Sequence, residues 1–170
     1  MPTPFLDEIE ANVPALRRYA RALTRNADRA DDLVQDCIER AIRKQGLWKP
    51  TGSLRAWLFR ILLNIYRSEL RRNRSRGEHV AVEAMVVEPA IAPSQPGRIA
   101  LAEMGRAIER LSADQREALL LVVLDGMSYA DAASALEVPM GTLMSRLGRA
   151  RAALRISTGA PEEPRLRTVK

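Results

Sequence analysis

The chain has few of the residues that carry covalent or metal-dependent chemistry. Its 170 residues include one cysteine, Cys37, and one histidine, His79. A single cysteine excludes an internal disulfide framework, and one cysteine with one histidine makes a poor metal site. Cys37 falls on an apolar helical face, where a small buried residue is expected. The sequence also holds no glycine-rich phosphate loop and no catalytic constellation, so we predict no enzymatic activity, no metal and no cofactor.

Long apolar runs are missing as well. The longest, Ala118 to Leu124, is far too short to span a bilayer. The N-terminus lacks a basic start followed by an apolar stretch, so no signal peptide is expected. We therefore expect a cytoplasmic protein with no stable membrane insertion.

Aromatic residues make up only 4% of the chain, whereas hydrophobic residues make up 46%, which is ample for a core. Alanine, leucine and arginine dominate, and all three favour helix, so the predicted fold class is all-α. The formal net charge is +6, which indicates a polyanionic partner. The charge is uneven: Ser53–Arg76 and Gly141–Arg155 are basic, and Asp28–Glu39 is rich in acids. This asymmetry predicts separate surfaces for different partners.

The most informative segment is Ser53 to Arg76, which sorts at helical spacing into two faces. Its apolar face comprises Leu54, Trp57, Leu58, Ile61, Leu62 and Ile65. A narrow polar face, called the basic stripe below, comprises Arg60, Asn64, Arg67, Arg71 and Arg74. A line of guanidinium groups suits a phosphate backbone. The alternative is an ordinary solvated basic face, and a second basic helix near the C-terminus favours nucleic acid.

Helical periodicity and capping signals divide the first part of the chain into three helices. The first runs from Phe5 to about Thr24, and Pro14 predicts a break or a new first turn within it. Asn26 or Asp28 is expected to cap the second helix, and Ser53 the third. Together they predict a compact lobe. The predicted order is a first domain over 1–76, a flexible linker over 77–97, a second domain over 98–157, and a disordered tail over 158–170.

The second domain contains a helix-turn-helix pattern. Its helical pattern begins with an apolar face of Ile99, Met104, Ile108 and Leu111. Capping boxes at Ser112/Gln115 and Ser128/Asp131 open two further helices. The segments 128–136 and 139–156 then form two helices joined by a short turn. On the last helix, Leu143, Leu147, Ala150 and Leu154 are expected to face the core, opposite an arc of Thr142, Ser145, Arg146 and Arg149. These side chains suit base edges and phosphates.

Four stretches carry a family resemblance: RADDLVQDCIERAIRK, GSLRAWLFRILLNIYRSELRR, LSADQREALLLVVLDGMSYADAASAL and VPMGTLMSRLGRARAAL. Together they resemble the extracytoplasmic-function class of bacterial RNA polymerase sigma factors, over about residues 10–156. The resemblance implies two small helical domains, sigma regions 2 and 4. It implies binding to core RNA polymerase and promoter DNA during transcription initiation, and control by an anti-sigma factor in a stress or envelope response. A monomer is expected for the free chain.

The resemblance also assigns residues. It implies that Asp32, Gln35 and Asp36, called the acidic patch below, bind the coiled coil of the polymerase β′ subunit. It places Trp48 and the basic stripe on the −10 element, although a tryptophan beside a helix start is as often a core cap. It places Thr142, Ser145, Arg146 and Arg149 on the −35 element. Two positions depart from the family: Glu137 stands where the turn usually has glycine, so an altered turn is expected, and Met144 stands where a basic residue is common.

Two other classes of protein fit parts of the pattern. An ordinary helix-turn-helix regulator would dimerise, but the chain shows no long heptad seam, and its acidic helix would have no role. A sigma-factor mimic that sequesters an inhibitor would not need DNA-binding surfaces, yet both basic faces are present.

Overall fold

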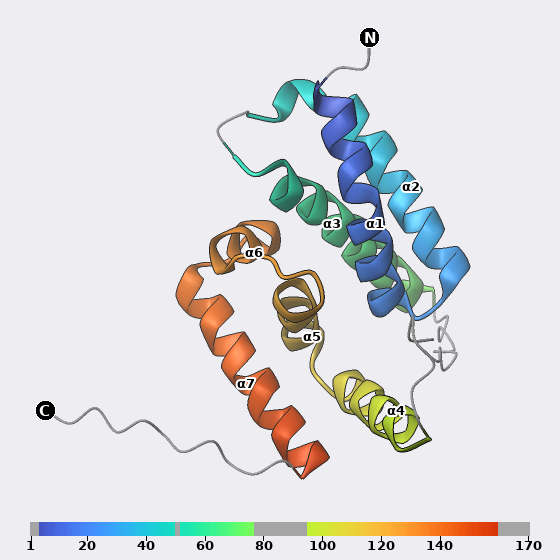
Figure 1. Ribbon diagram of the computed structural model, residues 1–170. Coiled ribbons are helices and arrows are strands. Elements are labelled where there is room, and N and C mark those ends of the chain that lie inside the picture. Colours follow the sequence, from blue (N-terminus) through green and yellow to red (C-terminus); the bar gives the residue numbers. More distant parts are fainter. Residues whose placement is uncertain (1–3, 50–51, 77–94, 160–170) are drawn as a thin grey trace, which may run out of the picture.

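Every regular element in the described part of the chain is helical, which confirms the predicted all-α class. The computed structural model describes residues 4–49, 52–76 and 95–159 (Figure 1). The elements, in chain order, are α1 (Pro4–Thr24), α2 (Ala27–Arg43), η1 (Gln45–Leu47), α3 (Leu54–Ser75), α4 (Gln95–Glu109), α5 (Ala113–Leu119), η2 (Leu120–Leu124), α6 (Tyr129–Leu136) and α7 (Met140–Thr158). None of these helices is long and apolar enough to cross a membrane.

Helices α1, α2 and α3 pack together as the first lobe, and two predicted caps are confirmed. The Asn26 side chain accepts a hydrogen bond from the Arg29 backbone N–H at 2.9 Å, and Ser53 Oγ accepts from the Ala56 N–H at 3.1 Å. These bonds satisfy amide groups that the first turn of a helix leaves without partners. Cys37 is fully buried and lies 3.4 Å from the Leu58 carbonyl oxygen, so it is a core residue, as expected.

The predicted break at Pro14 is wrong, because α1 continues through that residue. Proline lacks the N–H that would bond to the carbonyl of Glu10. Both residues are exposed, so water can satisfy that carbonyl. The next turn buries Ala15, Leu16 and Tyr19, and this burial holds the helix together despite the proline.

The second lobe consists of α4 to α7. The capping box at its first predicted site is confirmed, with Ser112 and Gln115 bonding reciprocally. The helix that this capping box opens, α5, ends at Leu119, and the chain then widens into the π-helical turn η2. Gly126 then reverses the chain with a φ of 60°, a left-handed conformation that suits glycine.

Helix α4 begins at Gln95, inside the segment predicted as linker. Two members of its predicted core face are instead exposed, Ile99 by 58% and Met104 by 40%. Among the described side chains of α4, burial begins towards its C-terminal end at Ala107, and it continues just beyond the helix at Leu111. The remainder of the predicted linker, 77–94, and the predicted tail beyond Gly159 lie outside the described residues.

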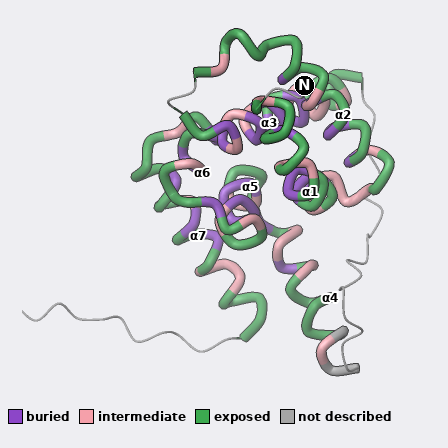
Figure 2. Tube along the Cα trace, turned by 45° about the horizontal axis from the view of Figure 1, so that its top comes forward, coloured by how far each residue is buried: buried purple, intermediate pink, exposed green. Residues whose placement is uncertain are grey.

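The two lobes share one hydrophobic core. Helix α6 packs on α3, and η2 packs on α1 (Figures 1 and 2). Leu121, Met127 and Leu136 of the second lobe belong to the same buried cluster as Leu58 and Leu62 of the first. The two sequence domains are therefore closed on each other in this structure.

Candidate nucleic-acid and polymerase interfaces

The acidic patch lies on the outer face of α2. Asp32, Gln35 and Asp36 are all exposed, and the opposite face of the helix buries Leu33 and Val34. The three side chains point to solvent. Gln35 Nε2 donates a hydrogen bond to Glu39 Oε1, one turn along the same helix, at 3.2 Å. The patch thus presents negative charge and hydrogen-bond acceptors to solvent, as complementarity with a basic partner requires.

A shallow groove between α1 and α2 adjoins this patch. Its floor is Val34 and Ile38, and Arg17 and Asp31 form its rim with a 3.8 Å contact. Sequence patterns missed the groove because its two walls come from different helices. It adds an apolar surface beside the acidic patch.

The basic stripe on α3 is divided into two parts by its surroundings. Arg71 and Arg74, near the C-terminal end of the helix, are exposed. Arg60, Asn64 and Arg67 point instead at the second lobe and pair with carboxylates there. No pattern in the sequence indicated this pairing.

Arg67 and Glu117 form the most buried of these contacts. The guanidinium donates from Nε and Nη2 to both carboxylate oxygens of Glu117, which is only 2% exposed. The hydrogen bonds to Glu117 raise the pKa of Arg67 above its ordinary value. The Tyr19 hydroxyl donates to the Glu117 backbone carbonyl at 3.1 Å, and burial raises the pKa of Tyr19 well above its usual value.

The Asp125 carboxylate is the second buried acid of the second lobe. It is inaccessible to solvent, accepts a 2.6 Å bond from Arg18, and lies 3.9 Å from Arg55. Burial raises its pKa, and the hydrogen bond from Arg18 opposes that shift. Like Glu117, Asp125 is held by arginines of the first lobe.

Glu137 occupies the turn of the helix-turn-helix in a left-handed conformation, with φ 56° and ψ 44°. The expected alteration of the turn is therefore wrong, and the backbone keeps the geometry that glycine would favour. A non-glycine residue there costs about 1–2 kcal/mol. The side chain accepts a 3.5 Å bond from Asn64 Nδ2 and lies 3.8 Å from Arg60, and these contacts offset part of that cost.

Trp48 lies away from the basic stripe and packs within the first lobe. Its ring centroid is 5.5 Å from that of Phe5, which also lies 6.3 Å from Trp57. The structure thus gives Trp48 the surroundings of a core cap. Stacking on a DNA base would require its indole to leave Phe5.

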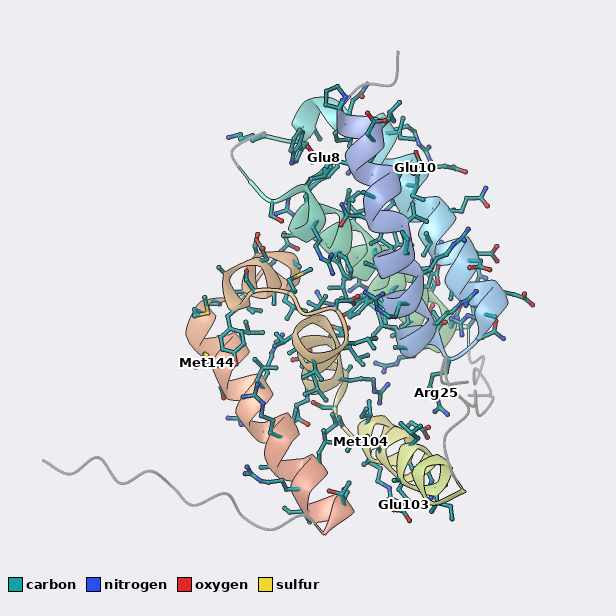
Figure 3. All side chains as sticks on the ribbon, in the orientation of Figure 1. Glu8, Glu10, Arg25, Glu103, Met104 and Met144 are labelled. Atoms are coloured by element: carbon teal, nitrogen blue, oxygen red, sulfur yellow. The ribbon has the colours of Figure 1, made fainter. Side chains whose placement is uncertain are left out.

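The predicted recognition helix is α7, and its two faces separate as expected. Leu143, Leu147 and Ala150 are fully buried. Thr142, Ser145 and Arg149 are exposed beside a groove between α7 and the start of α5. Arg146 lies in the same groove, paired at 2.8 Å with Asp114. Met144, where the family resemblance led us to expect a basic residue, is half exposed on the outer side of α7 (Figure 3).

Comparison with known proteins identifies both lobes. Residues 9–63 match the family described as the Sigma2 domain of PhyR, and residues 101–154 match Sigma-70 region 4. The chain is 44% identical to the ECF RNA polymerase sigma factor EcfG of Rhodopseudomonas palustris, over 87% of this chain and 81% of the relative.

Two solved structures share the arrangement. One is the sigma factor RpoE bound to the anti-sigma factor NepR from Bartonella quintana, with a TM-score of 0.75 and 38% identity, over 93% of this chain and 98% of that one. The other is CnrH bound to the cytosolic domain of CnrY, with a TM-score of 0.67 and 28% identity, over 93% and 89%.

A helical region 2 lobe followed by a helix-turn-helix lobe defines a transcription initiation factor of the sigma type. The chain belongs to the extracytoplasmic-function family of RNA polymerase sigma factors.

Proposed function

We propose that this chain binds core RNA polymerase and directs it to promoters whose −10 and −35 elements it recognises. The acidic patch on α2 binds the β′ coiled coil, the basic stripe on α3 follows the −10 strand, and the exposed arc of α7 enters the −35 major groove. The role requires binding surfaces alone, and the polymerase performs the synthesis.

One observation carries the proposal: both lobes keep a polar, partly basic face opposite a fully apolar one. On α3, buried Leu58 and Leu62 lie opposite the basic stripe. On α7, buried Leu143 and Leu147 lie opposite the exposed arc. A chain that only imitated the sigma shape would have no use for two DNA-binding faces.

We also propose control by an anti-sigma factor. The structures of RpoE with NepR and of CnrH with CnrY are complexes of this kind. Both cover most of the present chain, which supports a small protein inhibitor as partner. A cytoplasmic location accords with these partners.

A second candidate is a mimic that captures an anti-sigma factor. The match of the first lobe to the Sigma2 domain of PhyR favours it, because a PhyR structure is described as an anti-anti-sigma factor in complex with NepR. That structure is only 15% identical to this chain and supports a shared fold alone.

Reconstitution with bacterial core polymerase separates the two candidates. The sigma function predicts specific transcription start sites on a genomic template library, absent with core polymerase alone. It also predicts that Arg67→Ala with Arg71→Ala abolishes those starts but leaves core binding intact. A chain that binds an anti-sigma factor and yields no specific start would be a mimic.

A further inference from the structure

The contacts between the lobes have a consistent polarity. In the described part of the chain, each ion pair across the lobe boundary joins an arginine of the first lobe to an acid of the second. The pairs are Arg18–Asp125, Arg25–Glu109, Arg55–Asp125, Arg60–Glu137 and Arg67–Glu117. The second lobe therefore presents acidic residues to the first lobe, although its own last helix, α7, is basic.

Two of these acids lie on the surface proposed for DNA. Glu117 engages Arg67 through both of its oxygens, and Glu137 engages Arg60 and Asn64. An arginine fork binds a carboxylate and a phosphate with the same two-point geometry. Three of the five members of the basic stripe are thus occupied by groups that resemble backbone phosphates.

We propose that the second lobe inhibits the free chain by occupying the −10 face, with Glu117 and Glu137 in the places of two DNA phosphates. The inference rests on the proposed function for the identity of the strand. For DNA to run along the whole of α3, the lobes must part. Arg71 and Arg74 stay exposed in the closed chain and provide a first contact for the strand.

The position of each acid argues against an incidental contact. Glu117 is 2% exposed, and among the described residues its charge is paired with Arg67 alone. Glu137 holds a left-handed turn that glycine would occupy without strain. Beside these ion pairs, α6 packs on α3, and its Ala132 and Leu136 belong to the apolar cluster that the two lobes share. The closed arrangement of the lobes therefore combines apolar burial with ion pairs between first-lobe arginines and second-lobe acids.

If most free chains are closed, the apparent affinity for DNA equals the affinity of the open chain multiplied by the fraction of chains that are open. The test uses the full chain with Glu117→Gln and Glu137→Gln together. Its control carries Glu8→Gln and Glu103→Gln, two exposed acids on α1 and α4 (Figure 3). Both variants change the net charge equally, so nonspecific attraction to DNA rises equally.

The probe is a fluorescent single-stranded 20-mer of mixed sequence, because phosphate contacts do not depend on sequence. At fixed low salt, the variant without Glu117 and Glu137 carboxylates should bind about three- to tenfold more tightly than its control. Equal affinities of the two variants would overturn the proposal, and so would the absence of detectable binding by both. Circular dichroism confirms that both variants keep their helical content.

A second measurement follows the lobes directly. Donor and acceptor dyes are attached at Glu10→Cys on α1 and Met144→Cys on α7, which are both exposed. Cys37 is buried and does not compete for the dyes. Saturation with the 20-mer should reduce energy transfer, and an unchanged signal at saturation would also overturn the proposal. Failure of the sigma function itself shows in a separate assay, as the absence of specific start sites with core polymerase.

Discussion

Arg67 of α3 and Glu117 of α5 form a two-point ion pair that joins the lobes, with the carboxylate buried and the guanidinium partly exposed. Removing the arginine leaves a buried carboxylate without its partner, at a cost of about 1–3 kcal/mol. Arg67→Ala should therefore lower the free energy of unfolding by that amount, measured in urea.

The matched control for this prediction is Arg71→Ala, one turn further along the same stripe. Arg71 is exposed and, among the described residues, bonds only to Ser68 at 3.0 Å, so its loss should change stability by less than about 0.5 kcal/mol. Adding Glu117→Gln to Arg67→Ala should recover part of the lost stability. Equal effects of Arg67→Ala and Arg71→Ala would show that the pair across the lobes contributes nothing.

Pro14 lies in the interior of α1 and is exposed, so it contributes strain and little packing. Pro14→Ala restores a backbone N–H opposite the Glu10 carbonyl and should raise the free energy of unfolding by about 1–3 kcal/mol. The control is Pro4→Ala at the first residue of the helix, where a missing N–H costs nothing. Thermal unfolding of both variants checks the difference, and a Pro14→Ala variant no more stable than the control would contradict it.

The caps and the apolar faces of α2, α3 and α7 could be predicted because they depend on local spacing. Ser53 accepts a hydrogen bond from the Ala56 N–H within the first turn of its helix. Leu143 and Leu147 are one helical turn apart on the same buried face. The same reasoning misjudged Ile99 of α4, because an apolar stripe indicates that a face can be buried and not whether a partner covers its whole length. Pro14 was misjudged because burial of the following turn outweighs a local preference.

The closure of the lobes had no signal in the sequence. Glu117 follows Gln115 and Arg116 and has the appearance of a surface residue on a polar turn. Its buried carboxylate is paired with Arg67, 50 positions earlier in the chain, through a contact that no local period encodes. Trp48 is similar, since it follows η1 and its packing partner Phe5 lies far away in the sequence, on α1. Residues far apart in the chain decide which predicted binding residues are free to bind.

The buried thiol of Cys37 gives a pH-dependent prediction. Burial raises its pKa from 9.0 to about 12, so the folded chain keeps the proton at pH values where the unfolded chain releases it. Below pH 9 both states are protonated and the thiol has no effect on the pH dependence of stability. Between pH 9 and about 12, it should lower the free energy of unfolding by about 1.4 kcal/mol per pH unit.

Cys37→Ser is the control for this titration, because a serine hydroxyl does not ionise in that range. The difference between the two urea-denaturation series against pH isolates the thiol from other groups. Parallel curves for the two proteins would show that the thiol is not shielded in the folded chain.

The acidic patch is predicted to bind core polymerase through charge complementarity. Asp32→Arg with Asp36→Arg should abolish binding, measured by biolayer interferometry, because two repulsive charges would face a basic surface. Both residues are exposed, so helical content should stay unchanged. The control, Glu8→Arg with Glu10→Arg on α1, makes the same change in net charge at another exposed site. Retained binding by the first variant would remove the patch from the interface.

Arg146 is predicted to read a base edge of the −35 element. It lies on the exposed side of α7 beside Ser145, and Asp114 holds its guanidinium at 2.8 Å. Arg146→Ala should weaken binding to the preferred promoter by about 1–3 kcal/mol and relax the preference at a single base pair.

Arg155→Ala, near the C-terminal end of the same helix, should weaken all sequences alike, as the loss of a phosphate contact does. Transcription from a promoter library randomised at the −35 element measures both effects. If the two variants changed the library profile in the same way, Arg146 would contact only the DNA backbone, and base recognition would rest with Thr142, Ser145 and Arg149.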